Sequence, residues 1–421
     1  MEKTKDNIQS SYQWVPSVYL MQGLPFALVT VVSAVLYKNF GFSNSVIAFY
    51  TSFFTLPWTI KFLFAPFLEK LTSKRTLTLL MQYTLVVLTL SLALVLYLFS
   101  SFYLLGIIFL MMALVSAVHD TSSDGIYLEY LNYTTQAKLI GVRTVFYQLG
   151  KLICQGGLLF AVGYFSIANK KLTWSCALAL FALFTWLIVL YNQKKLSVYP
   201  PVKRKNFSVN TFTTQNTYKN VWLELRQLPH LIIVLIFILI YNLPQAQIMK
   251  IIPLFMLDHP AQGGLGLGVE QVGIIYGTLG VISMLLGSTL AGLLLEKFTL
   301  KNCLFPFTLL AVLANISYLL LTIYSAHAIW QITSCVLLAE FAYGLTNGAY
   351  MLYLVHMFSN RHYAMSLYAI GTAFMQLGMM IGASFSGYLQ LAFGYEGFFV
   401  WIIVIGLVIS SLTFYTVNEI L

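Results

Sequence analysis

The chain has 421 residues, of which 59% are hydrophobic and only 9% are charged. Soluble domains average about 45–50% apolar and 25% charged residues, so this composition excludes a soluble globular protein and indicates a membrane protein. A net charge of +10 is also typical of nucleic-acid-binding proteins. Here, however, the basic residues lie between the apolar stretches, as the positive-inside rule describes. We therefore expect the lipid bilayer as a partner and no nucleic acid.

The first apolar stretch and the cysteines exclude two other classes. That stretch is about 25 residues long and lacks a small-x-small cleavage site, so we interpret it as a membrane helix and not as a cleavable signal. The four Cys are scattered through apolar stretches without a C-x-x-C pair, which favours structural thiols over a disulfide or a metal site. We predict no metal and no cofactor.

Apolar runs long enough to cross a bilayer recur along the whole chain. At 1.5 Å of rise per residue, about 20 helical residues span the hydrocarbon core. We expect twelve spans, near 14–38, 44–68, 76–99, 103–128, 139–165, 171–195, 228–256, 270–296, 301–325, 328–356, 362–390 and 395–418. The long segment between the sixth and seventh spans predicts an N-terminal six-helix bundle (1–195), a cytoplasmic linker (196–227) and a C-terminal six-helix bundle (228–421).

The basic residues predict the orientation of these spans. Sixteen of the 23 Lys and Arg fall in segments on one side, and three fall on the other, namely Lys38, Lys170 and Lys171. The positive-inside rule then places both termini and the linker in the cytoplasm. The remaining four, Lys61, Arg143, Lys151 and Lys250, lie inside spans.

The two halves repeat each other in four motifs that occur in the same order. The pairs are Gly23-Leu24-Pro25 with Asn242-Leu243-Pro244, Leu68-Glu69-Lys70 with Leu295-Glu296-Lys297, Asp124-Gly125-Ile126-Tyr127 with Asn347-Gly348-Ala349-Tyr350, and Gln148-Leu149-Gly150 with Gln376-Leu377-Gly378. Parallel six-helix repeats are the plan of the major facilitator superfamily, whose substrate site lies between the halves near the midplane. Pro25 and Pro244 each remove a backbone hydrogen bond, which indicates either a cavity lining or a packing kink.

Two carboxylates, Asp120 and Asp124, lie one helical turn apart in the fourth span. An acidic residue costs roughly 2.5–3.5 kcal/mol near the centre of a membrane helix, so such residues are paired or functional. Depth along antiparallel spans matches Asp120 with Lys61 and Asp124 with Arg143, and it brings Lys151 within reach of Asp120.

Two interpretations of this cluster stay open. The residues form static ion pairs, or they exchange protons during transport. For proton coupling we favour Asp120, since it lies deeper than Asp124 and burial disfavours a charged carboxylate. The adjacent His119 is either a proton relay or a hydrogen-bonded structural residue.

Polar residues near the span breaks are candidates for substrate binding, because amides and phenols suit a substrate rich in hydroxyls and amides. Helix-packing hydrogen bonds are the alternative for each. Glu340 is either a substrate contact or a protonated hydrogen-bonding residue. The set is Gln22, Tyr127, Gln148, Tyr241, Asn242, Gln245, Gln247, Glu340, Tyr343 and Asn347.

The spacing from His119 to Asp124 also fits the H-x4-D signature of glycerolipid acyltransferases. Five helical residues turn the two side chains about 140° apart, whereas a catalytic dyad needs hydrogen-bond contact. We therefore predict that the chain is not an enzyme. A membrane acyltransferase and a non-transporting receptor remain remote alternatives.

Four segments resemble the AmpG-type branch of the major facilitator superfamily. They are Tyr19 to Pro25, Leu56 to Pro66, His119 to Gly125 and Leu149 to Gly157. The resemblance implies import of anhydro-muropeptide from periplasm to cytoplasm with the proton gradient. The resemblance implies that Asp120 and Asp124 correspond to the two acidic residues in the fourth span of AmpG permeases. His119 stands where those permeases have a Gln.

The chain also departs from that branch. AmpG permeases typically have an Arg where Gln148 stands and an apolar residue where Lys151 stands. The short twelve-span form is similar to the siderophore importers of the same branch. The superfamily's cytoplasmic loop is degenerate in both halves, but each copy keeps an acid before a base, which predicts a cytoplasmic gate at Glu69 and Lys70 and at Glu296 and Lys297.

We therefore predict an all-α integral membrane protein with the twelve-helix major facilitator fold. It is expected to be a monomeric, proton-coupled importer in the bacterial inner membrane. Anhydro-muropeptide is the first candidate for its small-molecule substrate, and a ferric siderophore is the alternative.

Overall fold

A computed structural model describes residues 2–61, 63, 73–99, 101–131, 133–165, 169–196, 214–228, 230–324, 328–359 and 364–419. These ranges contain helices and no strand, and ten of the helices are long and apolar enough to cross a membrane. The tenth, Leu367–Thr416, combines the last two predicted spans. The predicted span 44–68 is described only up to residue 63. The predicted all-α membrane architecture is confirmed.

The chain forms two compact units. Unit 1 consists of Met1–Tyr37, Ile60–Ser208 and Val269–Gly273. Unit 2 consists of Lys38–Thr59, Val209–Gly268 and Ile274–Leu421. Each unit thus contains a short segment from the other half of the sequence. The predicted domain boundaries stay a prediction, and the predicted linker contains the helix α11 (Thr214–Arg226).

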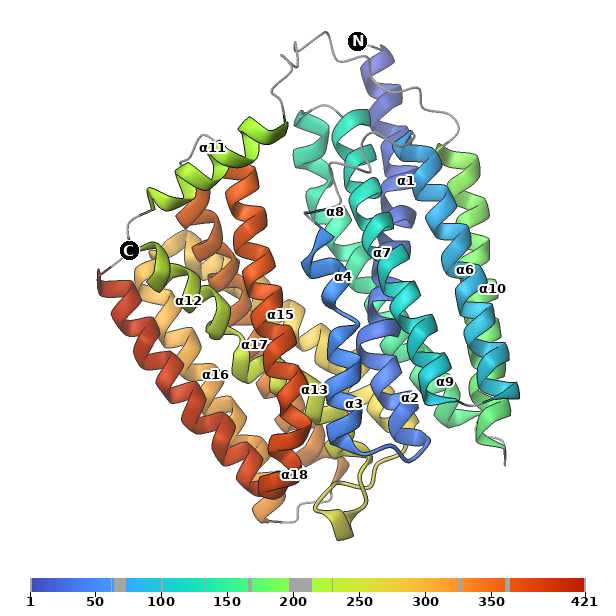
Figure 1. Cartoon of the computed structure of the whole chain (residues 1–421), viewed down its shortest axis with the longest axis vertical. Helices are drawn as coiled ribbons and strands as arrows, with labels where there is room; N and C mark the ends of the chain where they lie inside the picture. The colour runs from blue at the N-terminus through green and yellow to red at the C-terminus, as the bar shows by residue number, and fades with distance from the viewer. Residues whose placement is uncertain are drawn as a thin grey trace. The chain divides into compact units, whose positions relative to one another are not determined.

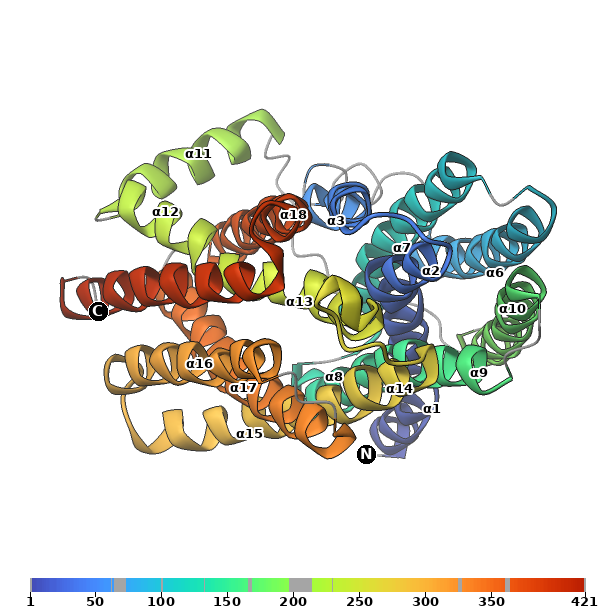
Figure 2. The same ribbon diagram turned by 90° about the horizontal axis from the view of Figure 1, so that it is seen from below.

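Unit 1 is built mainly from the first half of the chain (Figure 1). Helices α6, α7 and α10 pack in one group, with α6 in contact with both of the others (Figure 2), and α1 packs against α8. A buried cluster that includes Trp14, Tyr19, Ile126 and Leu139 joins α1, α7 and α8. Its helices are α1 (Glu2–Ala27), η1 (Leu28–Val32), α2 (Ser33–Asn39), α6 (Lys74–Leu98), α7 (Phe102–Tyr130), α8 (Tyr133–Leu152), η2 (Ile153–Leu158), α9 (Leu159–Tyr164), α10 (Lys170–Leu196) and α14 (Val269–Val272).

Unit 2 is built mainly from the second half, with a core that includes Phe237, Tyr241, Tyr350 and Tyr353. The rings of Tyr241 and Tyr350 stack with centroids 4.4 Å apart. Besides α11, its helices are α3 (Asn44–Phe53), α4 (Leu56–Thr59), α12 (Leu231–Tyr241), α13 (Leu243–Leu257), η3 (Pro260–Gln262), η4 (Gly273–Gly280), α15 (Val281–Lys297), α16 (Leu300–Ile323), α17 (Ile329–Ser359) and α18 (Ala364–Glu419).

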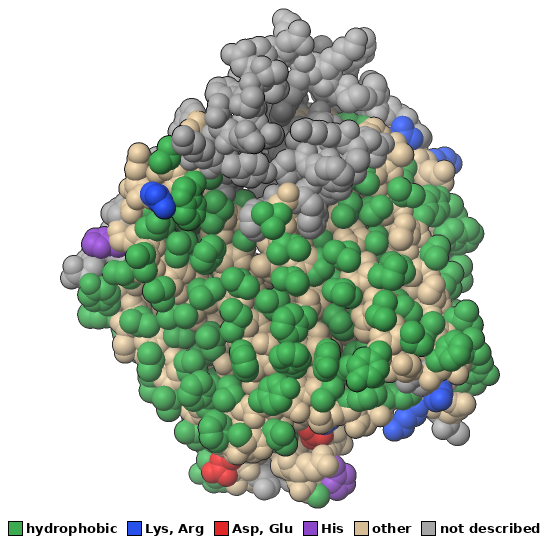
Figure 3. All heavy atoms as spheres, in the orientation of Figure 1, with side chains coloured by type: hydrophobic (Ala, Val, Ile, Leu, Met, Phe, Trp, Pro, Cys, Tyr) green, Lys and Arg blue, Asp and Glu red, His purple; other side chains and the backbone are tan. Residues whose placement is uncertain are grey.

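The outward faces of the helices are apolar. On α6, Leu80, Val87 and Leu94 recur every seven residues, and each is more than half exposed. In the view of Figure 3 hydrophobic side chains cover the middle of the surface, and the coloured charged side chains lie near its edges. Seven residues make almost two full helical turns, so such a stripe faces one direction. In a membrane protein such an exposed apolar stripe faces lipid, because a large apolar surface is unfavourable in water.

The two repeat-related prolines act differently. Pro25 lies inside α1, which continues to Ala27 and passes into the π-helical turn η1. Pro244 stands at the start of α13, after a one-residue interruption at Asn242 (φ −89°, ψ 7°). Because proline has no amide hydrogen, it fits the first turn of a helix without losing a hydrogen bond. Span 7 (Leu231–Leu257) is therefore one apolar segment that is interrupted at Asn242, and polar residues near the interruption line a cavity of unit 2.

Candidate functional site

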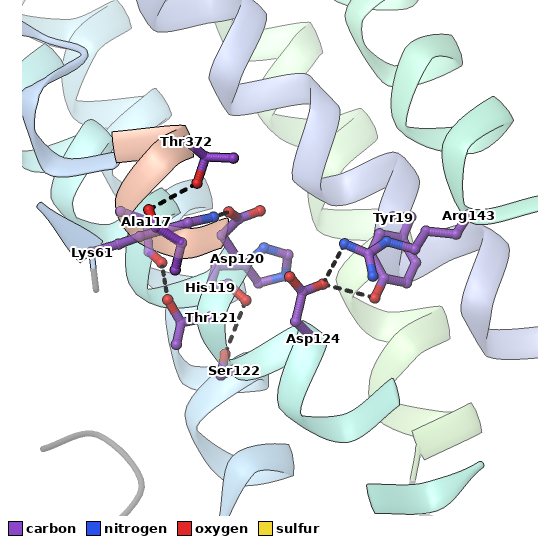
Figure 4. A network of polar contacts seen from close by, with 11 residues as sticks. Tyr19, Lys61, Ala117, His119, Asp120, Thr121, Ser122, Asp124, Arg143 and Thr372 are labelled. Carbon is purple, nitrogen blue, oxygen red and sulfur yellow. Dashed lines mark hydrogen bonds and ion pairs between the residues drawn. The ribbon is translucent and has the colours of Figure 1, made fainter. Parts of the chain in front are cut away.

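Helix α7 presents two carboxylates from successive turns, and a cation from another helix meets each one (Figure 4). Lys61 Nζ lies 2.5 Å from Asp120 Oδ2. Arg143 of α8 lies 2.8 Å from Asp124 Oδ1. Residues four apart share a helix face, which is why one helix can meet both partners. The structure thus contains both pairings that the depth of the residues predicts.

Asp124 is anchored on several sides. The Tyr19 hydroxyl of α1 donates a hydrogen bond of 2.9 Å to Asp124 Oδ1. The Arg143 guanidinium also lies over two aromatic rings, 4.5 Å from the centroid of Tyr19 and 5.6 Å from that of Tyr127. Such contacts add to the ion pair, because a ring face attracts a cation. This carboxylate joins α1, α7 and α8, which is the geometry of a structural pair.

Asp120 is held in a simpler way. Its described ion-pair partner is Lys61, whose side chain is 40% exposed while that of Asp120 is 11% exposed. The Asp124–Arg143 pair is not more enclosed, since both of its side chains are 33% exposed. Lys151, predicted to reach Asp120, places its ammonium 5.8 Å from the centroid of the Phe26 ring. Asp120 therefore differs from Asp124 in having fewer described partners and not in being more accessible.

His119 belongs to a separate buried network in unit 1. Its Nε2 lies 3.0 Å from Gln82 Nε2 and 3.3 Å from Ser123 Oγ. Gln82 Oε1 accepts a hydrogen bond from Asn192, whose own carbonyl oxygen accepts one from Ser17. Because the Gln82 amide donates to it, His119 Nε2 is an acceptor, and the neutral ring carries its hydrogen on Nδ1. These contacts favour the structural reading of His119, and the relay role stays a prediction.

Two predicted substrate residues of unit 1 carry buried acceptors without a partner among the described residues. They are Gln22 Oε1 on α1 and Gln148 Oε1 on α8. Leaving such a buried group unsatisfied costs about 1–3 kcal/mol. These side chains are therefore poised to accept a hydrogen bond from water or from a ligand.

Unit 2 contains a cavity of about 40 Å³ at the α12–α13 break. Four predicted substrate residues line it, together with Thr308 and Asn315 of α16: Tyr241, Asn242, Gln245 and Tyr343. The Nδ2 of the buried Asn242 has no hydrogen-bond partner among the described residues. Tyr241 and Thr308 already bond to each other at 2.9 Å. The cavity offers neutral donors and acceptors and no charged side chain, which suits an uncharged polar group.

Other predicted site residues are placed differently. Gln247 Oε1 accepts a hydrogen bond of 3.0 Å from Trp401 Nε1, which favours packing over substrate contact. Glu340 is buried, Asn347 is half-buried, and Glu296 and Lys297 are exposed at the end of α15. Of the predicted gate, Glu69 and Lys70 lie outside the described residues.

Several hydrogen-bond partners in these sites could not be predicted from the sequence. Tyr19, Gln82 and Asn192 come from other helices than the residues they contact. The available signal was a polar residue inside an apolar span, such as Asn192 in α10 or Asn315 in α16. That signal identifies the residue but not its partner.

Comparison with known families decides the class of the protein. The profile of the Major Facilitator Superfamily matches residues 17–373. The chain belongs to the Major Facilitator Superfamily. It is therefore a multi-pass membrane transporter for small molecules, and its relatives and fold are those of transporters and not of enzymes. The acyltransferase alternative has no support.

Named relatives within this superfamily agree with the resemblance to the AmpG branch. A Rickettsia bellii (strain RML369-C) protein named AmpG 1 is 24% identical over 84% of this chain and 85% of its own length. The anhydromuropeptide permease of Escherichia coli (strain K12) is 23% identical over 40% of this chain and 33% of its own length.

Solved structures show the same fold. A bacterial homolog of the human lysosomal transporter Spinster superposes with a TM-score of 0.75 at 15% identity, covering 98% of this chain and 97% of that one. The D-xylose–proton symporter reaches 0.72 at 15% identity, covering 96% and 97%. At these identities the likeness supports the superfamily fold and does not bear on substrate.

Proposed function

We propose that this superfamily transporter imports anhydro-muropeptide with protons across the bacterial inner membrane, with both termini in the cytoplasm. The main support for this substrate is the similarity to a protein named AmpG 1 over 84% of the chain. The similarity to the Escherichia coli anhydromuropeptide permease supports it over a shorter stretch. The cytoplasmic termini rest on the distribution of basic residues.

The pair of Asp120 and Lys61 supports proton coupling. Protonation of Asp120 would neutralise the carboxylate and release the Lys61 ammonium, so the pair changes its net charge by one. A buried group whose charge changes with its access to water can bias a protein between two conformations. Asp124 keeps Arg143 and Tyr19 as partners and serves to hold the helices.

The polar groups that have no partner among the described residues support a hydrogen-bond-rich substrate. These are the acceptors Gln22 Oε1 and Gln148 Oε1 in unit 1 and the donor Asn242 Nδ2 at the cavity of unit 2. A site that is built to hydrogen-bond its substrate discriminates strongly against analogues that lack those groups. Amide and sugar groups of a muropeptide match this set.

Uptake into proteoliposomes tests the proposal directly. Purified protein is reconstituted, and labelled anhydro-muropeptide is offered with and without an inward proton gradient. We expect accumulation with the gradient, and only slow equilibration without it. Ferric siderophore is offered in parallel. If siderophore accumulates and muropeptide does not, the proposed substrate is wrong. If accumulation does not depend on the gradient, the proposed proton coupling is wrong.

A further inference from the structure

A network of four polar side chains joins the start of α3 to two distant segments of unit 2. Asn44 Nδ2 donates to Asp258 Oδ2 at 2.9 Å and to the Tyr395 hydroxyl at 2.8 Å. The Tyr395 hydroxyl donates to Asp258 Oδ2 at 2.5 Å. Lys38 forms an ion pair with Asp258 and donates to Asn44 Oδ1 at 2.7 Å. We call Lys38, Asn44, Asp258 and Tyr395 the Asp258 network.

The network has a distinctive place in the chain. Lys38 and Asn44 belong to the first sequence repeat, whereas Asp258 directly follows α13 and Tyr395 follows the kink at Gly394 in α18. These positions lie at or just beyond the non-cytoplasmic ends of predicted spans, so the predicted topology places all of them on the non-cytoplasmic side. Asp258, Asn44 and Tyr395 are each less than 9% exposed. A buried carboxylate at this end is thus satisfied by residues from both repeats.

The rest of the contact between α3 and the second repeat combines small polar residues with an aromatic pair, Phe49 and Tyr388 of α18. The buried residues of α3 are Asn44, Ser45, Ile47, Ala48, Thr51 and Ser52. Gly387 of α18 packs so closely that a Cβ there would collide with the Asn44 carbonyl oxygen. Lys250 of α13 donates to Thr51 at 2.8 Å.

Small residues allow such close helix contact in membranes. Four of the six buried residues of α3 are polar, so directional bonds contribute to its attachment alongside Ile47 and the contact of Phe49 with Tyr388.

We propose that the Asp258 network is a releasable latch, which holds α3 against α13 and α18 and opens in every transport cycle. Superfamily transporters alternate access by rocking one repeat against the other. Segment 38–59 belongs to the first repeat but packs within unit 2. Its contacts with the second repeat therefore have to break when the repeats rock apart. This inference rests on transport of the superfamily type, and it is independent of the substrate.

Accessibility of a cysteine on the buried face of α3 tests the latch without any substrate. In full-length protein with the four native Cys replaced by Ala, Ala48→Cys serves as the reporter, because Ala48 is fully buried and belongs to α3. Ser43→Cys in the exposed loop before α3 is the matched control. The reaction with a water-soluble maleimide in detergent is followed by mass spectrometry.

Neutralising the network should expose the reporter. Asp258→Asn leaves Lys38 without its counter-charge, so the reaction of Ala48→Cys should accelerate by about tenfold or more. The reaction of Ser43→Cys should not change. The reversed pair, Lys38→Asp with Asp258→Lys, should bring the rate back toward that of the parent. An unchanged Ala48→Cys rate in Asp258→Asn, or no recovery in the reversed pair, overturns the latch.

A cross-link tests whether opening is required. Lys38→Cys with Asp258→Cys is joined by a bifunctional maleimide, and counterflow is measured with the substrate that the parent transports. Cross-linked protein should lose transport, and each single variant treated with the same reagent should keep it. Full transport by the cross-linked protein overturns the proposal. The maleimide test needs no substrate, so it still tests the latch if anhydro-muropeptide is not transported. Failure of the proposed function and failure of the latch can therefore be told apart.

Discussion

The two acids of α7 differ in how their charge is held. Asp124 has Arg143 and the Tyr19 hydroxyl as partners. Asp120 has Lys61, whose side chain is far more exposed than its own. A carboxylate with several partners loses more when it is neutralised than one with a single partner. At the scale of single residues this supports our proposal that Asp120 exchanges the proton and that Asp124 holds the helices together.

Neutralising Asp120 should uncouple transport. Asp120→Asn removes the group that we propose to exchange the proton, so gradient-driven accumulation in proteoliposomes should fall to the equilibration level while counterflow exchange continues. Thr121→Val is the matched control on the same turn, because among the described residues the Thr121 hydroxyl bonds to the Ala117 carbonyl of its own helix. Accumulation that survives in Asp120→Asn would show that the proton is carried elsewhere.

Replacing Arg143 by lysine should destabilise unit 1. Lysine lacks the planar group that stacks on Tyr19 and bonds Asp124 at the same time. Losing a hydrogen bond between charged groups typically costs about 1.5–3 kcal/mol. The melting temperature of the purified protein in detergent should drop accordingly. An unchanged melting temperature would mean that the Asp124 pair contributes no stability.

Removing the free donor at the α12–α13 break should weaken substrate binding. Asn242→Leu fills the same space without the amide, so KM should rise with little change in kcat, as expected when a contact made equally in ground and transition states is lost. Gln247→Leu is the comparison, because Gln247 already bonds Trp401. Equal effects of the two variants on KM would argue for packing and against substrate contact.

At the scale of helices, the repeated Gln-Leu-Gly motif marks equivalent crossings. A Cβ on Gly150 of α8 would collide with the Leu20 carbonyl oxygen of α1, and one on Gly378 of α18 would collide with the Leu239 carbonyl oxygen of α12. Each glycine thus lets the fifth helix of its repeat approach the first. Small residues at such crossings let membrane helices pack by close backbone contact.

Adding a methyl group at either crossing should therefore destabilise the protein. Gly150→Ala and Gly378→Ala should each cost about 1–3 kcal/mol, as overpacking of a tight interior does, and should lower the melting temperature. Gly141→Ala, in the same helix as Gly150 but facing open space, should have no such effect. Equal melting temperatures for Gly150→Ala and Gly141→Ala would contradict the close crossing.

At the scale of the whole molecule, the orientation in the membrane is the property that charge predicts most directly. The excess of Lys and Arg on one predicted side places both termini in the cytoplasm. A fluorescent protein fused to the C-terminus should therefore be bright, and alkaline phosphatase fused there should be inactive. Phosphatase inserted after Gly41, in the loop before α3, should be active. The reverse pattern would invert the proposed direction of transport.

Sequence alone determined the membrane class, most of the helices and the position of the two acids on one helix face, because these depend on local composition and on the 3.6-residue period. It also predicted the pairing of Asp120 with Lys61 and of Asp124 with Arg143, since depth along antiparallel spans follows from chain position. Only the tertiary structure decided the remaining partners. Asn44 and Asp258 stand 214 positions apart, and no local pattern links residues that meet solely because helices from two repeats pack together.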